Sequence, residues 1–299
     1  MIIGDGIMLG AGGGESASIF VTGLSETDTV TASKDGKTVT GVWTQKPNPV
    51  SHGLPDGYTE LEYIEATGSQ YVVTNIHPSL TTVVKFGAKF TSKAPNIYIG
   101  HMANYDASGW DESDWRFIQH SSSVRLDMGA TQVDSSELNA VVVNNYHDYE
   151  MGNFYLKVDG ASKISSDSVT GSNGFENYPI CIFGTGVSSS SPANSSGELH
   201  YVTFYEGETL TANLIPAKRN SDSVIGLYDF VNDVFYTNAG TGTFTAGPEV
   251  PQTIGGFLIK PIRNFGTWTV TATDGTKTAT QDVLVDVITE YEIEMSLSA

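Results

Sequence analysis

Thr29-Val30-Thr31-Ala32 recurs near the other end of the chain as Thr269-Val270-Thr271-Ala272, and an Asp-Gly turn follows each copy, at Asp35-Gly36 and at Asp274-Gly275. Alternating Thr and apolar residues before such a turn predict a β-strand that leads into a hairpin. A stretch of about forty residues buries too little apolar surface to fold alone, whereas a unit of roughly twice that size can. We therefore predict one small β-sandwich built from both ends of the chain.

The residues between the two repeats predict a second domain inserted into the first. Lys46-Pro47-Asn48-Pro49 interrupts the first strand pattern, and Pro248-Glu249-Val250-Pro251 interrupts the last one. The predicted organisation is a flexible arm over residues 1–14, a discontinuous sandwich over 15–50 plus 251–299, and an inserted domain over 54–248.

The inserted domain has the two-residue period of β-strands. Val84, Phe86, Ala88 and Phe90 alternate with polar or small residues, and Asn232-Asp233 separates two apolar runs as a hairpin turn would. No window of useful length shows a helical stripe. We therefore predict an all-β chain, with a sandwich or jelly roll between the two ends.

The charge of the chain excludes some partners. There are 34 acidic and 15 basic residues among 299, a net charge of −19, and the basic residues do not cluster. Neither nucleic acid nor an anionic membrane surface would be attracted to such a chain. Cys181 is the single cysteine, so we expect no intrachain disulfide and an inert, buried thiol.

Residues 1–9 do not predict an export signal. Asp5 interrupts their apolar character and no basic residue precedes them, so we expect neither a signal peptide nor membrane insertion. A protein that acts outside the cell would then need another route out, such as assembly into a virus particle in the bacterial cytoplasm.

Two parts of the insert resemble a known family. Leu54-Pro55-Asp56-Gly57-Tyr58-Thr59-Glu60-Leu61-Glu62-Tyr63 and the residues up to Tyr71 are similar to the opening of concanavalin A-like (laminin-G-like) jelly rolls of gut-bacterial phages and prophages. The closing segment of that family is similar to Pro216-Ala217-Lys218-Arg219, Gly226-Leu227-Tyr228-Asp229 and Phe235-Tyr236-Thr237-Asn238.

The flanking pieces resemble an immunoglobulin-like module of phage structural proteins, from Val21 to Trp43 and from Gly266 to Val287. Together the resemblances imply a virion component with a lectin-like fold. They imply no particular ligand, because a fold alone does not give a function.

The loop over residues 104–115 is the predicted ligand surface, because aromatic faces and planar acceptors together suit sugars. The candidate glycan contacts are Tyr105, Trp110, Asp111 and Asp114, whereas Trp115 alternates with Phe117 and is expected in the core. Calcium between Asp106, Asp111 and Asp114 is an alternative use of these oxygens. No known calcium-loop spacing supports it, so we predict no metal and no cofactor.

A run of acids, Glu60-Leu61-Glu62-Tyr63-Ile64-Glu65, resembles the paired carboxylates of concanavalin-like glycosidases. Its middle acid is Glu where that family has Asp, and it stands at the start of the domain instead of on a central strand. We therefore predict a solvated opening strand and no enzyme activity.

The leading hypothesis is a non-enzymatic virion structural protein, a tail or baseplate adhesin whose jelly roll binds bacterial surface carbohydrate. Its expected partners are other virion subunits, including copies of itself, because weak lectin sites gain from avidity. A capsid decoration or head-fibre protein and a glycoside hydrolase are the alternatives.

Overall fold

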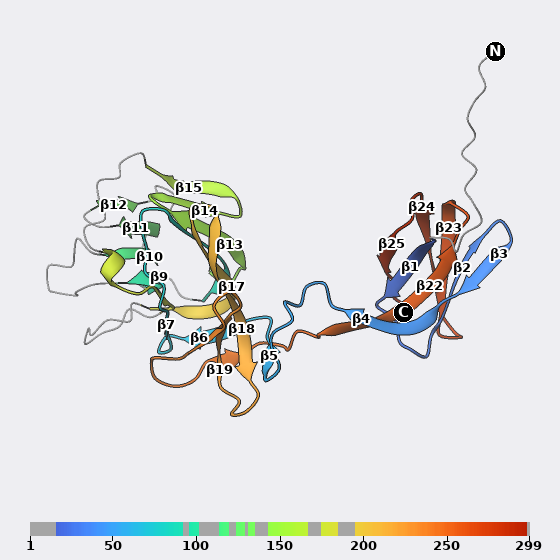
Figure 1. The fold of residues 1–299 in the computed structure, drawn as a ribbon, viewed down its shortest axis with the longest axis horizontal. Helices are drawn as coiled ribbons and strands as arrows, with labels where there is room; N and C mark the ends of the chain where they lie inside the picture. The colour runs from blue at the N-terminus through green and yellow to red at the C-terminus, as the bar shows by residue number, and fades with distance from the viewer. Residues whose placement is uncertain are drawn as a thin grey trace, which may run out of the picture. The chain divides into compact units, whose positions relative to one another are not determined.

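The computed structural model describes residues 16–91, 96–101, 114–119, 124–128, 131–134, 143–166, 175–184 and 195–297. The described chain is all-β, with one short 3₁₀ turn (η1, Phe175–Asn177). It divides into two compact units. Residues 1–51 with 251–299 form one unit, which has the blue and red ends of the colour bar in Figure 1, and residues 52–250 form the other. The second boundary falls within Pro248-Glu249-Val250-Pro251, and the first lies two residues after Lys46-Pro47-Asn48-Pro49.

The terminal unit is a sandwich of two four-stranded sheets. The first sheet has the order β25-β1-β22-β4 and the second has the order β24-β23-β2-β3. Each sheet combines strands from both ends of the chain. The strands are β1 (Ala17–Thr22), β2 (Thr29–Lys34), β3 (Lys37–Thr40), β4 (Val42–Pro47), β22 (Thr253–Ile262), β23 (Gly266–Thr273), β24 (Thr278–Val285) and β25 (Glu290–Glu294).

The two sequence repeats are neighbours in the second sheet. β2 and β23 pair antiparallel, with Val30 opposite Ala272 and Ala32 opposite Val270. All four side chains are fully buried in the core between the sheets. The repeated Thr-Val-Thr-Ala pattern therefore supplies both sides of one cross-strand contact, which is the unit that stabilises a sheet.

Trp268 anchors this core from β23. It is buried, and its indole N–H donates to the Asn264 carbonyl at 2.7 Å. Trp43 packs against the same core from β4, with its ring 5.2 Å from that of Phe257. Trp268 is thus a core residue, and Trp43 is partly buried at the edge of the same core.

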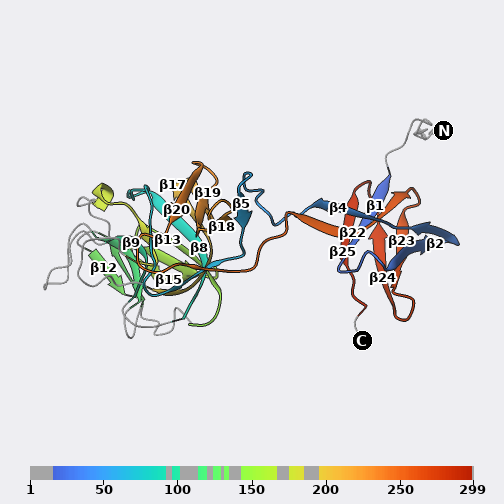
Figure 2. The ribbon, with the colours of Figure 1, turned by 90° about the horizontal axis from the view of Figure 1, so that it is seen from below.

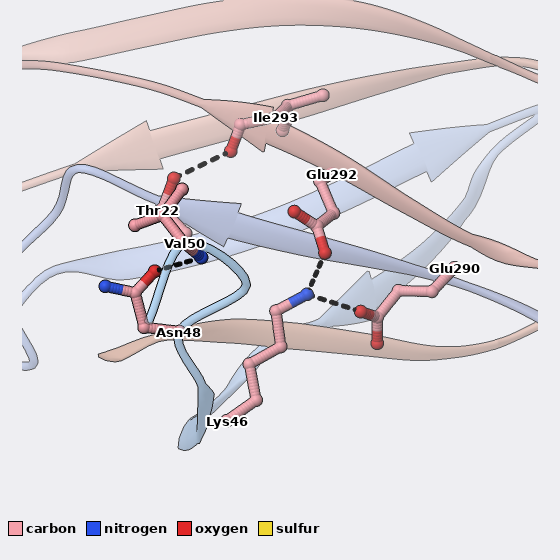
Figure 3. Close-up of polar contacts among 7 residues, drawn as sticks. All are labelled: Thr22, Lys46, Asn48, Val50, Glu290, Glu292 and Ile293. Atoms are coloured by element: carbon pink, nitrogen blue, oxygen red, sulfur yellow. Dashed lines mark hydrogen bonds and ion pairs between the residues drawn. The ribbon is translucent and has the colours of Figure 1, made fainter. Parts of the chain in front are cut away.

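The outer face of the first sheet carries a buried aromatic ring beneath a lysine. The ammonium of Lys46 lies 4.3 Å from the centre of the Phe20 ring and pairs with the carboxylates of Glu290, at 2.6 Å, and Glu292 (Figure 3). A Cβ at Gly256 would lie 2.8 Å from the Phe20 ring, so the glycine leaves the space that this ring fills. Lys46 thereby connects the two edge strands across the face of the sheet.

The inserted unit replaces the turn of one hairpin. Pro47 at the end of β4 pairs with Thr253 at the start of β22, and the Asn48 N–H donates to the Gln252 carbonyl at 2.9 Å. The chain that leaves β4 and the chain that returns to β22 are therefore adjacent. An insertion at such a point leaves the pairing of the host strands intact.

The inserted unit has two antiparallel sheets (Figure 1, Figure 2). The larger sheet follows β15-β14-β13-β8-β17-β18-β19-β20, with β5, β6 and β21 paired beside it, and the smaller sheet follows β12-β11-β10-β9-β16-β7. The larger sheet comprises β5 (Tyr58–Glu60), β6 (Ile64–Thr67), β8 (Thr82–Phe90), β13 (His147–Gly152), β14 (Tyr155–Val158), β15 (Ala161–Ser165), β17 (Ser196–Glu206), β18 (Thr209–Arg219), β19 (Ile225–Asp229), β20 (Val234–Thr237) and β21 (Thr245–Ala246). The smaller comprises β7 (Val72–Val73), β9 (Asn96–His101), β10 (Trp115–Gln119), β11 (Val124–Met128), β12 (Thr131–Asp134) and β16 (Cys181–Ile182).

The chain crosses between these sheets repeatedly, from β7 to β8, then to β9, and later to β13, β16 and β17. Such crossing between two antiparallel layers is the connectivity of a jelly roll. The core between the layers is aromatic: the Phe86 and Tyr149 rings stack at 4.7 Å, and Trp115 and Phe117 of β10 close it from the smaller sheet.

The predicted alternation in β8 is confirmed. Val84, Phe86, Ala88 and Phe90 are buried, which leaves Val83, Lys85, Gly87 and Lys89 on the outer face of the larger sheet. In the closing segment, Leu227 pairs with Tyr236 and Tyr228 with Phe235. The last pair before the loop is Asp229 with Val234, so residues 230–233 form the hairpin loop in place of a two-residue turn.

No helix among the described residues has the length and apolar character needed to cross a membrane. Cys181 is buried, and burial raises the pKa of its thiol to about 12, which keeps it protonated and inert as expected.

Candidate functional site

The predicted ligand loop lies largely outside the described residues. Tyr105, Trp110 and Asp111 fall there, as does Asp106, so their role stays a prediction. Asp114 is described, and it differs from the expectation of an exposed sugar or calcium contact. Its carboxylate is buried and lies 3.1 Å from the Arg116 guanidinium, because it belongs to an ion-pair network on the smaller sheet.

Asp127 is the centre of that network. Its carboxylate lies 2.6 Å from Arg116 Nε and 2.8 Å from Arg125 Nε, and all three side chains are almost completely buried. The Arg125 Nε contact is close without the alignment of a hydrogen bond, while Arg125 Nη2 donates to Asp127 at 3.1 Å. Charges that satisfy one another in this way hold strands β10 and β11 together.

The acidic run at the start of the insert does not bring its two outer carboxylates onto one strand. Glu60 ends β5 and Glu65 lies on β6. Glu60 is 2% exposed and accepts the backbone N–H of His52 at 2.9 Å, while His52 Nδ1 lies 2.7 Å from its second oxygen. Glu60 thus holds the entry of the chain into the inserted unit, in place of the solvated position that the sequence predicts for it.

The contact between His52 and Glu60 predicts a pH dependence of stability. The hydrogen bond to Glu60 raises the pKa of His52, against a smaller opposing effect of burial. A raised folded-state pKa means that the contact stabilises fully below the unfolded pKa of about 6.5 and is lost as pH rises through the folded pKa. We expect the unfolding midpoint of His52→Gln to fall below that of the parent chain by more at about pH 6 than at about pH 8.

His200→Asn provides a control of opposite sign. Burial lowers the pKa of His200, so this histidine makes the folded protein less stable as pH falls below about 6.5. The His200→Asn variant should therefore gain on the parent at low pH. If His52→Gln lowered the unfolding midpoint equally at both pH values, the predicted pH dependence of the contact between His52 and Glu60 would be wrong.

Among the described residues, no three His, Cys, Asp or Glu side chains are grouped so that they could hold a metal ion. A cluster of polar and aromatic side chains instead covers the outer face of the larger sheet, on and beside the neighbouring strands β14, β13, β8 and β17. We name it the tyrosine platform. It comprises Tyr63, Lys85, Gly87, Lys89, Tyr146, Asp148, Glu150, Gly152, Tyr155, Lys157, Glu198, His200, Tyr201 and Tyr205.

Gly87 is the floor of the platform's centre. A Cβ at this position would lie 2.3 Å from the Tyr146 hydroxyl and 2.6 Å from a Tyr201 ring carbon, so both rings occupy space that only glycine leaves open. Both hydroxyls donate to Asp148 Oδ1, at 2.7 Å from Tyr146 and 3.0 Å from Tyr201. Burial first, and then the Asp148 carboxylate, raise the pKa of both phenols, so they remain donors at neutral pH.

The same construction recurs on β13, the strand next to β8. Tyr155 lies over Gly152, where a Cβ would be 2.5 Å from its ring, and its hydroxyl donates to Glu150 at 3.2 Å. Burial and Glu150 raise the pKa of Tyr155 to about 12. Glu150 also accepts from Lys157 at 2.8 Å, and this lysine is the main reason that the pKa of Glu150 is lowered.

A β-bulge adds the ring of His200 to the platform. The register of β17 against β8 shifts between Leu199 and Tyr201, and His200 is the extra residue. Its ring lies 4.9 Å from that of Tyr146 and 5.3 Å from that of Tyr63. The bulge therefore extends the aromatic surface from the centre of the platform toward β6.

The platform presents ring faces next to fixed carboxylates, which is the chemistry that holds a sugar. Sequence reasoning placed Lys85 and Lys89 on this outer face but assigned the face no role. The available signal was glycine at outward strand positions, Gly87 and Gly152, because glycine within a strand marks a site where another group approaches closely.

No family model matches the chain, and no curated protein matches it. Among solved structures, the native heptameric SAP-like pentraxin from Limulus polyphemus is similar with a TM-score of 0.32 and 11% identity, over 67% of this chain and 94% of that one. A likeness at this level carries no argument about the ligand of this chain.

Proposed function

We propose that the protein is a non-enzymatic carbohydrate-binding protein whose inserted unit binds glycan on the tyrosine platform. The observation that supports it is the pair Tyr146 and Tyr201, which share one floor at Gly87 and one acceptor at Asp148. Because the rings are already held in place, little side-chain freedom is lost when a sugar binds.

The proposal retains a virion surface as the setting, with other virion subunits and copies of the protein itself as partners. It takes both from the resemblance of the insert to phage jelly rolls. It moves the expected sugar contact from the loop over residues 104–115 to the face of the larger sheet, because there Tyr146 and Tyr201 lie beside the carboxylate of Asp148.

Replacing both central tyrosines tests the proposal. Tyr146→Ala with Tyr201→Ala should weaken binding of the full chain to its glycan by about 30-fold for each ring, since truncation of a central aromatic contact costs about 2 kcal/mol or more. A glycan array identifies the ligand, and isothermal titration calorimetry with that glycan then measures the loss.

Phe230→Ala is the matched control. Phe230 is 46% exposed and Tyr146 is 45% exposed, and Phe230 lies in the hairpin loop after β19, outside the platform. Its removal should leave affinity unchanged. Gly87→Ala, which keeps both tyrosines but fills their floor, should weaken binding as well. Full affinity in the double tyrosine variant would overturn the proposal.

A further inference from the structure

Each lysine of the tyrosine platform pairs with a glutamate of the same face, and Glu150 is shared by two of them. Lys157 and Lys85 both pair with Glu150, at 2.8 Å and 3.5 Å, and Lys89 pairs with Glu198 at 2.6 Å. The bonds run between adjacent strands, since Glu150 lies opposite Lys157 on one side and opposite Lys85 on the other. On strands β14, β13, β8 and β17, the described outer face therefore carries no lysine without an acidic partner.

Three lysines of this face meet four carboxylates, those of Glu150, Glu198, Asp148 and the neighbouring Glu65, so one negative charge is in excess. Asp148 accepts two phenol hydroxyls, which are neutral donors and leave its charge in place. Glu65 lies opposite Glu198 in the pairing of β6 with β17 and adds a further carboxylate near Lys89. Burial lowers the pKa of His200, so its imidazole adds no positive charge at pH 7.

We propose that the platform selects neutral glycans and excludes anionic ones, and that Glu150 sets this selectivity. This inference rests on the proposed carbohydrate binding. Uronate, sulfate or phosphate groups bind best to a cation without an acidic partner, and here each central lysine already pairs with a glutamate. A neutral sugar needs only ring faces and hydroxyl partners, which Tyr146, Tyr201 and Asp148 supply.

The arrangement also indicates an oligosaccharide as the ligand. Neighbouring strands are about 4.8 Å apart, so the distance from β14 to β17 across three intervals is roughly 14 Å. Tyr155 stands on the first of these strands and Tyr201 and Tyr205 on the last. A single sugar cannot contact both ends of such a surface, so affinity should increase with chain length.

A glycan array with neutral, uronate-containing and sulfated members, probed with the full chain, tests the selectivity. The hits should be neutral. Their affinity should change by less than about twofold between low and high salt, because no net ion pairing forms between protein and ligand.

Glu150→Gln provides the positive test. It removes the acidic partner of Lys85 and Lys157, so the variant should bind an oligouronate at least about tenfold more tightly than the parent, and salt should weaken that binding. Glu208→Gln makes the same change in net charge at an exposed turn outside the platform, and it should leave the selectivity of the parent.

The outcomes separate the two proposals. Salt-sensitive binding of uronate or sulfated glycans by the parent would overturn the selectivity while leaving carbohydrate binding in place. Unchanged uronate binding in Glu150→Gln would remove Glu150 as the determinant. Absence of binding to any glycan class would overturn the proposed function itself.

Discussion

Truncation of the chain after Val250 is expected to unfold strands β1 to β4 completely while the inserted unit stays folded. β1 would lose both of its neighbours, β22 and β25, and β4 would lose its single neighbour. Of the buried cluster in the terminal sandwich, only Ala17, Ile19, Val21, Val30 and Ala32 would remain. The β2–β3 hairpin that is left is marginal in water without further strands. Hydrogen exchange followed by mass spectrometry should show full exposure of residues 17–47 and retained protection in β8 and β17.

The complementary chain should fold. If a short Gly-Ser turn replaces residues 52–250, the β4–β22 pairing from Pro47 and Thr253 onward is closed as an ordinary hairpin. Its thermal unfolding should be cooperative. Protection of residues 17–47 in the truncated chain, or a noncooperative transition in this shortened one, would show that the two ends do not complete one core.

Replacement of Asp127 by Asn should destabilise the inserted unit by about 3–5 kcal/mol, because it leaves two buried guanidinium groups without their shared carboxylate. For a unit of this size the loss corresponds to a decrease of roughly 10 °C in the unfolding midpoint. Differential scanning calorimetry of the full chain can measure it, since the terminal sandwich should keep its own transition.

A variant that removes the whole network is the control for this prediction. Replacing Asp114, Arg116, Arg125 and Asp127 together by apolar side chains of similar size leaves no unpaired charge, and its cost should be much smaller. A loss of less than about 1 kcal/mol in Asp127→Asn would instead mean that water compensates the arginines.

The fold was predictable because the apolar positions follow the strand period closely. The Thr-Val-Thr-Ala repeats pair with each other, and the alternation in β8 gives the buried face that the structure has. The predicted boundaries relied on the prolines of the two linkers, which are a weak signal here because Pro216 lies inside β18 and Pro261 inside β22.

The site was not predictable in the same way. A rule that favours loops selected residues 104–115, whereas the platform joins residues from strands far apart in sequence, such as Gly87, Asp148 and Tyr201. Their convergence depends on register: Asp148 and Tyr201 both lie opposite Gly87, from two sides. Composition contains no information about such cross-strand neighbours. The burial of Asp114 and Glu60 also depends on partners that spacing does not reveal, Arg116 in one case and His52 in the other.

The parallel pairing of β1 with β25 determines how the terminal sandwich would respond to tension. The two strands run in the same direction, with Ser18 opposite Glu290 and Thr22 opposite Glu294. Pulling the beginning of β1 away from the end of β25 loads all their hydrogen bonds together, in shear, instead of opening them one after another. The inserted unit leaves and re-enters through one hairpin, so it lies off this force path. A chain anchored by one terminus and pulled by the other would therefore keep the proposed sugar-binding face unstrained until the sandwich itself ruptured.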